Sequence, residues 1–217
     1  MNEDITAIEE STKRERIEKI YNKYKKLIYI FIFTILTLSI SIYFYIDFKK
    51  KTKQKLSDQY IQATILLKSG ENEKIEKAKN SLTKIILSND STYSTLALFL
   101  IINQNLIKDK SEVESLFNQV INNNNFDEEI KNLLIFKKAL TISEFVDENK
   151  ILQTLNPIIN SDSIWKPHAL MLLGDYFFYK NNFIKAKEFY NNLLLVKNIN
   201  QELYQRAVSQ LGIISGD

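Results

Sequence analysis

The hydrophobic pattern divides the chain into one long apolar run followed by a series of short amphipathic segments. Residues 27–46 contain no charged residue, and about 20 apolar residues are what a helix needs to cross a hydrocarbon core of ~30 Å. Tyr29 lies near one end of this run, and Tyr43 and Tyr45 lie at the other, as is typical of aromatic side chains at membrane interfaces. The run is longer than the apolar region of a signal peptide, and no small-residue cleavage site follows it. The pattern predicts an uncleaved transmembrane helix.

Apolar residues recur at helical spacing on both sides of this run, at Ile17, Ile20, Tyr21 and Tyr24 before it and at Leu56, Tyr60, Ala63 and Leu67 after it. Neither glycine nor proline occurs before Gly70. We therefore predict one nearly unbroken helix from about residue 12 to residue 69, which ends where Gly70 adopts the left-handed conformation.

Beyond Gly70, helical spacing alternates with short polar turns. The predicted helices cover residues 72–88, 92–107, 112–122, 127–146, 148–160, 164–180, 182–196 and 200–214. Ser111 with Glu114, and Asn125 with Glu128, have the spacing of capping boxes. No alternating strand pattern competes with these helices. With the helix before Gly70 they make about four helical hairpins and a closing helix, so the sequence predicts an all-α protein with a helical-repeat domain.

The last hairpin matches the tetratricopeptide pattern most closely. The large, small and aromatic residues of that pattern fall at Leu170, Leu173, Gly174, Phe177, Phe183, Ala186 and Tyr190. Small residues at positions 174 and 186 let two helices approach closely, and the aromatic side chains fill the space between hairpins. We predict a right-handed repeat of tetratricopeptide-like helical hairpins.

Composition argues against most enzyme classes. The net charge of +3 is spread along the chain, without the basic stripe that nucleic acids require. There is no cysteine, and His168 is the only histidine, so histidine-based triads and His/Cys metal clusters cannot assemble. The acidic pairs at positions 127–128 and 147–148 lie at predicted helix starts, where they complement the helix dipole. We expect no catalytic residue, cofactor or metal.

Nearly the whole chain resembles a known family in its layout of a short charged tail, one anchor and a degenerate tetratricopeptide domain, and several segments carry the resemblance most sharply. Residues 9–24, 93–97, Trp165 and residues 169–190 are similar to the YfgM-like ancillary subunits of the bacterial Sec translocon, of the alphaproteobacterial type. Lys25 and Lys26 stand where those relatives often have glycine or proline. The resemblance implies an inner-membrane protein with a periplasmic domain. It also implies contact with translocon subunits, with a membrane-anchored periplasmic chaperone and with exported polypeptides.

The charges beside the apolar run leave its orientation nearly open. The lysines within ten residues of its ends are Lys19, Lys23, Lys25 and Lys26 before it and Lys49, Lys50, Lys51, Lys53 and Lys55 after it. A wider window adds Lys13, Arg14 and Arg16 to the short side, and long domains cross membranes largely regardless of charge. With the resemblance, this favours a cytoplasmic tail (residues 1–26), an anchor (27–46) and a periplasmic domain (47–217). The reversed orientation, with a cytoplasmic scaffold domain, is the alternative.

Two groups of residues are candidate contact sites. In the tetratricopeptide register, the first helix of the last hairpin lines a partner-binding groove with His168, Met171, Asp175, Phe178 and Tyr179. The alternative is that Phe178 and Tyr179 pack against the closing helix, and for Trp165 we favour core or interface packing. In the anchor, one helical face carries Thr34, Thr37 and Ser41. These hydroxyls either contact a partner helix in the membrane or bond to their own preceding carbonyls.

We expect a non-catalytic adaptor at the Sec translocon that helps pass newly exported proteins to periplasmic chaperones. A scaffold for another envelope assembly process, such as cytochrome c maturation, is an alternative within the same class. A membrane-bound hydrolase that uses only carboxylates is the alternative from a different class.

Overall fold

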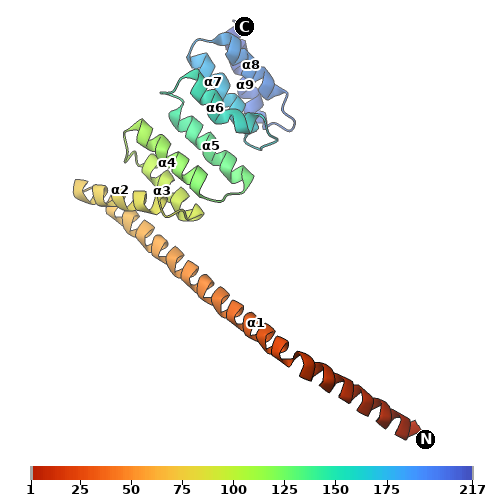
Figure 1. The fold of residues 1–217 in the computed structure, drawn as a ribbon. Helices are drawn as coiled ribbons and strands as arrows, with labels where there is room; N and C mark the ends of the chain where they lie inside the picture. Colours follow the sequence, from red (N-terminus) through yellow and green to blue (C-terminus); the bar gives the residue numbers. More distant parts are fainter. Residues whose placement is uncertain (1, 217) are drawn as a thin grey trace. The chain divides into compact units, whose positions relative to one another are not determined.

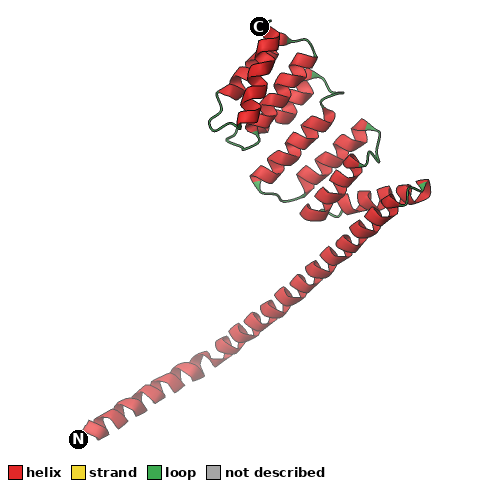
Figure 2. Cartoon of the chain, turned by 180° about the vertical axis from the view of Figure 1, so that it is seen from behind, coloured by secondary structure: helices red, strands yellow, loops and turns green. Residues whose placement is uncertain are grey.

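The structure is a computed structural model that describes residues 2–216, with side chains described for residues 21, 23–27 and 29–216. Within residues 2–216 every regular element is a helix, which confirms the predicted all-α class (Figure 2). The helices are α1 (Asn2–Lys68), α2 (Asn72–Ile86), α3 (Ser91–Asn103), α4 (Lys110–Asn123), α5 (Glu128–Ile142), α6 (Glu148–Ile159), α7 (Lys166–Tyr179), α8 (Phe183–Leu194) and α9 (Gln201–Ser215).

The long first helix is confirmed. It begins earlier than predicted, at Asn2, and ends at Lys68, two residues before Gly70. Gly70 has φ +71°, the left-handed conformation that stops a helix at little cost when the residue has no Cβ. Within α1, one stretch is long and apolar enough to cross a membrane, and none of it is buried in the protein.

The chain forms two compact units, Met1–Lys55 and Leu56–Asp217. The second unit takes in the last turns of α1, where Leu56 and Ala63 are buried among residues of the following helices. It is this unit that contains all the short helices.

Helices adjacent in sequence pack side by side in the second unit, and helices two apart also touch, as α5 and α7 do (Figure 1). The buried side chains form two clusters, one from the end of α1 to α5 and one from α5 to α9. Helix α5 belongs to both, with Leu134 in the first cluster and Ala139 and Ile142 in the second. These helices therefore bury their apolar faces mainly against their neighbours along the chain.

Asparagines end several of the helices. Four of them adopt positive φ values between 49° and 58°, at Asn89, Asn105, Asn181 and Asn198. One of them explains why α3 ends at Asn103 and not at residue 107, as predicted. Asn105 turns left-handed and lets the Leu106 amide donate to the Ile101 carbonyl at 3.0 Å, which closes the helix.

Both predicted capping boxes are wrong. Asp109 caps α4 instead of Ser111, and its carboxylate accepts from the amide of Ser111 at 2.8 Å. Helix α5 starts at Glu128 after Asp127, not after Asn125. At the start of α4, the Asp109 carboxylate is a better acceptor than the Ser111 hydroxyl, because its negative charge also complements the helix dipole.

The acidic pairs do lie at helix starts as predicted. Asp127 directly precedes α5 and Glu128 is its first residue, although the Asp127 side chain makes no cap bond. Asp147 begins α6, and its carboxylate accepts from the Lys150 amide at 2.8 Å.

Candidate partner-binding surface

The contact between α7 and α8 depends on a glycine. A Cβ at Gly174 would lie 2.3 Å from Cε1 and 2.5 Å from Cδ1 of Tyr190, closer than such atoms approach in proteins. Tyr190 and Ala186 are completely buried, and so is Leu173. Of the residues predicted for this hairpin, Leu173, Gly174, Ala186 and Tyr190 therefore fit together and fix α7 against α8, whereas Phe183 is 44% exposed.

A polar network ties α9 to this hairpin. The Tyr190 hydroxyl donates to Oδ1 of Asp175 at 2.9 Å, and the Arg206 guanidinium of α9 donates to Oδ2 at 2.5 Å. Burial raises the pKa of Asp175, and the tyrosine bond and the arginine charge only partly offset this effect. Burial, with the hydrogen bond to Asp175, also raises the pKa of Tyr190. The carboxylate of Asp175 therefore joins three helices.

The five residues predicted to line a groove lie at different depths. Met171 is only 3% exposed and belongs to the core. Phe178 is half-buried and meets the Phe183 ring edge-on, with centroids 5.7 Å apart. Asp175 is half-buried, whereas Tyr179 is 88% exposed. Of the predicted aromatic pair, Phe178 therefore packs within the domain and Tyr179 projects into solvent.

His168, the fifth of these residues, belongs to an aromatic cluster. The Trp165 and Phe136 rings are stacked with centroids 5.9 Å apart, and the His168 ring lies 5.4 Å from Trp165 and 6.0 Å from Phe136. Its Nδ1 is buried and has no hydrogen-bond partner among the described residues. Burial lowers the pKa of His168, so the imidazole is neutral at pH 7. Trp165 is half-buried, in accord with the packing role that we favoured for it.

A cleft of about 580 Å³ opens at the end of α7. It is lined by Ser143, Glu144, Leu172, Asp175, Tyr176, Tyr179 and Lys180. Two of the five predicted groove residues, Asp175 and Tyr179, are among them. We call this the α7 cleft.

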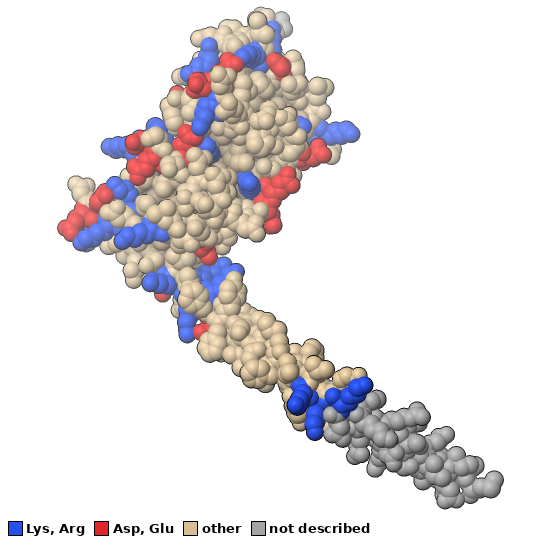
Figure 3. All heavy atoms as spheres, in the orientation of Figure 1, with Lys and Arg blue, Asp and Glu red and all other residues tan. Residues whose placement is uncertain are grey.

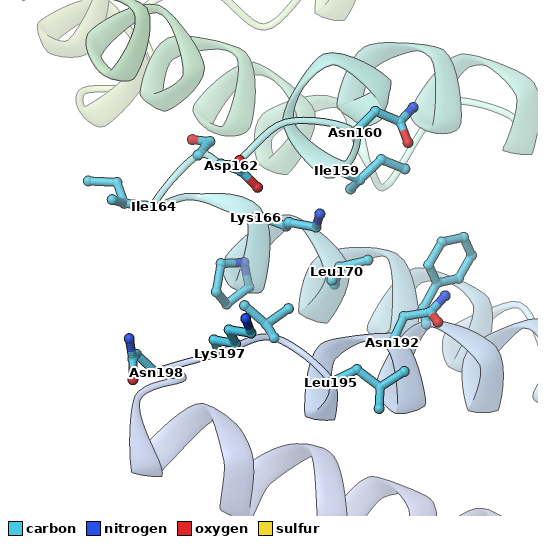
Figure 4. Close-up of a pocket in the computed structure, with 14 residues that line it drawn as sticks. Ile159, Asn160, Asp162, Ile164, Lys166, Leu170, Asn192, Leu195, Lys197 and Asn198 are labelled. Carbon is cyan, nitrogen blue, oxygen red and sulfur yellow. The ribbon is translucent and has the colours of Figure 1, made fainter.

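A larger pocket, of about 800 Å³, was not predicted. Its walls come from the α6–α7 loop on one side and from α8 and the loop after it on the other, with the first turns of α7 between them (Figure 4). It is lined by Ile159, Asn160, Asp162, Ser163, Ile164, Lys166, Pro167, Leu170, Phe189, Asn192, Leu195, Val196, Lys197 and Asn198. We call it the loop pocket.

Two rim residues of the loop pocket explain why sequence reasoning missed it. Ile164 and Leu195 are 68% and 79% exposed, but the predicted helices 164–180 and 182–196 included both as ordinary helical residues. Helix α7 begins at Lys166, and α8 ends at Leu194. Pro167 was the available signal, because proline is favoured in the first turn of a helix and leaves Ile164 outside it.

A carboxylate between two lysines joins α4, α5 and α6. Glu114 lies 3.0 Å from Nζ of Lys138 and 2.7 Å from Nζ of Lys150, and Lys138 also donates to Asn118 at 2.8 Å. Burial alone raises the pKa of Glu114, but the two lysines outweigh it and hold the pKa below its usual value. Oε1 of Glu114 makes both ion pairs, although neither meets the geometry of a hydrogen bond. Because the charges compensate one another, we assign this cluster a structural role.

In the apolar run, the predicted contact face of Thr34, Thr37 and Ser41 is exposed. The Thr34 hydroxyl donates to the Ile30 carbonyl at 2.8 Å, and that of Ser41 donates to the Thr37 carbonyl at 2.9 Å. The Thr37 hydroxyl donates to the Thr34 carbonyl, also at 2.9 Å. The three hydroxyls therefore bond to their own helix, and their methyl and methylene groups are what the face offers to a neighbour.

Among the residues whose side chains are described, no three His, Asp or Glu side chains come together as a metal site. No protein-family model, no curated protein and no solved structure matches the chain.

Proposed function

We propose that the protein is a non-catalytic adaptor of the inner membrane that acts at the Sec translocon and helps pass newly exported polypeptides to periplasmic chaperones. One observation supports a polypeptide-binding role above all others. Four large apolar side chains in and directly beside the α7–α8 hairpin are 68–88% exposed, namely Ile164, Tyr179, Ile184 and Leu195. Ile164 and Leu195 line the loop pocket, and Tyr179 lines the α7 cleft. Exposed apolar groups beside open clefts suit weak contacts with apolar segments of unfolded chains.

The proposed architecture is a right-handed tetratricopeptide-like repeat. Two features support it: the contacts that α7 makes with both helices two positions away, α5 and α9, and the close approach at Gly174. In such a repeat the first helices of the hairpins share one face, where α7 would offer Tyr179 and the α7 cleft to a partner.

The proposed location rests on the long apolar helix and on the resemblance to translocon subunits. An anchor confines the domain to the membrane surface, which raises its effective concentration near an exit site. Weak contacts would then suffice, and they would let clients leave for a chaperone.

The proposed topology places the tail in the cytoplasm and the helical domain in the periplasm. Because the chain has no cysteine, single cysteines can be introduced without removing others. With a membrane-impermeant maleimide, we expect Lys131→Cys in α5 to be labelled in intact spheroplasts and Glu9→Cys in the tail to be labelled only after lysis. The reverse result would place the domain in the cytoplasm and refute the proposal.

Polypeptide binding is tested with the purified full chain and a fluorescently labelled unfolded protein. Replacing two exposed apolar residues, Tyr179→Ser with Ile184→Ser, should weaken binding by about thirtyfold, since each contact residue of this kind is worth about 1 kcal/mol and two are removed. The matched control is Leu87→Ser with Ile130→Ser. Both residues are exposed and apolar; Leu87 directly follows α2, and Ile130 lies in α5. Equal loss in both variants, or none in the first, would contradict a binding role for the α7–α8 region.

A further inference from the structure

The end of the apolar run nearer the helical domain carries a dense group of lysines. Five of them fall within seven residues, and we call them the lysine collar: Lys49, Lys50, Lys51, Lys53 and Lys55. All five are exposed. Successive residues of an α-helix are rotated by about 100° around its axis. The five lysine side chains therefore point to three sides of α1, and the collar surrounds the helix instead of forming a stripe along one face.

Little negative charge opposes the collar. Between residues 47 and 57 the only acid is Asp47, which lies 2.8 Å from Nζ of Lys51. Among the residues whose side chains are described, no carboxylate lies within ion-pair distance of the other four ammonium groups. Four positive charges are therefore available to a ligand. Figure 3 shows basic side chains at both ends of the apolar stretch of α1.

The aromatic residues next to the collar fix its depth. Tyr43, Phe44, Tyr45 and Phe48 are 65–70% exposed and directly precede it. Exposed aromatic side chains at the end of an apolar run lie at the level of the lipid headgroups. With a rise of 1.5 Å per residue, Lys49 follows Ile46 by about 4.5 Å and Lys55 by about 13 Å, and flexible side chains let all five reach the phosphate layer.

We infer that the lysine collar binds the phosphate groups of anionic phospholipids and holds this end of α1 in the headgroup layer. The chemistry is that of a juxtamembrane basic segment, in which each lysine near an anionic surface strengthens binding about fivefold. The inference requires that α1 spans a membrane but is independent of the translocon.

The test uses a local reporter in the full chain. In a Trp165→Phe background, Phe48→Trp provides one tryptophan beside the collar. The protein is reconstituted into vesicles of phosphatidylcholine and phosphatidylglycerol, and in separate samples one lipid or the other is brominated in its acyl chains. Quenching of the tryptophan fluorescence by each brominated lipid then gives the relative affinity of the two lipids for this site. We expect phosphatidylglycerol to be preferred at least about fivefold at low salt, with loss of the preference in high salt.

Two variants with the same change in charge separate local binding from net charge. Lys49→Gln, Lys50→Gln, Lys53→Gln and Lys55→Gln together should abolish the preference. The matched control replaces four exposed lysines of the helical domain by glutamine, at Lys108, Lys131, Lys137 and Lys197, and should leave it unchanged. Free phosphate is the other source of this ligand chemistry, so replacing chloride by phosphate at equal ionic strength should also leave the preference unchanged.

The inference is overturned if both lipids quench equally at low salt, or if the four-lysine collar variant keeps the preference. Loss of the preference in the domain control, or on exchange of chloride for phosphate, would also overturn it. Absence of quenching by either lipid would place residue 48 outside the bilayer and would also overturn the inference, because the collar would then not reach the headgroups.

Discussion

Replacing Gly174 by alanine should destabilise the domain, although alanine is the better helix former. The new Cβ would lie 2.3–2.9 Å from three ring atoms of Tyr190, where ordinary contacts begin at 3.4 Å. The ring has little room to move, because Tyr190 is completely buried and its hydroxyl is bonded to Asp175. Overpacking of this kind costs up to about 3 kcal/mol, and the gain in helix propensity returns about 1 kcal/mol. We therefore expect a net loss of about 2 kcal/mol.

The assay is urea unfolding of the detergent-solubilised full chain, followed by the fluorescence of Trp165, the only tryptophan. Trp165 is packed against Phe136 and His168 and borders the cluster that contains Tyr190, the residue that Gly174 meets, so its emission reports on this core. With a denaturant dependence of about 2 kcal/mol per molar urea, the midpoint should fall by about 1 M.

The matched control is Gly212→Ala in α9, where a Cβ would meet no atom within 4 Å. This variant should be more stable than the wild type by about 0.5–1 kcal/mol. Combining Gly174→Ala with Tyr190→Leu should cost less than the sum of the two single changes, because the smaller side chain removes the overlap. If Gly174→Ala unfolds at or above the wild-type midpoint, the close approach of α7 and α8 is refuted.

Three further predictions concern the same domain. An NMR titration of the single histidine should give a pKa below 6.5. Because the unfolded chain then binds the proton more tightly than the folded chain, the free energy of unfolding should fall as pH drops below about 6.5. His168→Gln should remove this pH dependence. Glu114→Gln should lower the free energy of unfolding in urea by about 1–3 kcal/mol at pH 7, because it removes both ion pairs. The stability that these ion pairs contribute is present above the usual carboxyl pKa and is lost as pH falls through the lowered pKa of Glu114. Wild type and variant should therefore become equally stable in acid. Asp90→Ala should cost about 1 kcal/mol, because Asp90 accepts from the Tyr93 amide at 2.9 Å, whereas Asp127→Ala, at a cap without such a bond, should cost less in the same assay.

The order of the helices could be predicted from the sequence because their apolar spacing and polar turns are local features. Gly70 illustrates this, since a glycine after a long helical pattern predicts a left-handed stop and the structure has one. The predicted helix boundaries were wrong where a competing local interaction was stronger than the one that the pattern suggested. Asn105 turns left-handed and ends α3 early, and Asp109 takes the cap that Ser111 was expected to provide.

The candidate surface was predictable only in part, because exposure depends on tertiary packing. The spacing that selected the five groove positions on α7 could not separate Met171, which is buried, from Tyr179, which is exposed. The bond from Arg206 to Asp175 joins residues 31 positions apart, and no local pattern indicates it. The loop pocket likewise depends on how three separate segments meet.

The central claim is that the helical domain meets exported polypeptides beside the translocon. The most direct measurement places a photoreactive phenylalanine at Tyr179, with Lys131 as the control position, and identifies the adducts formed in living bacteria. We predict adducts from position 179 with a translocon subunit and with pulse-labelled exported chains, and few from position 131. Adducts with haem-ligation components and no translocon subunit would contradict the claim and favour a scaffold for cytochrome c maturation.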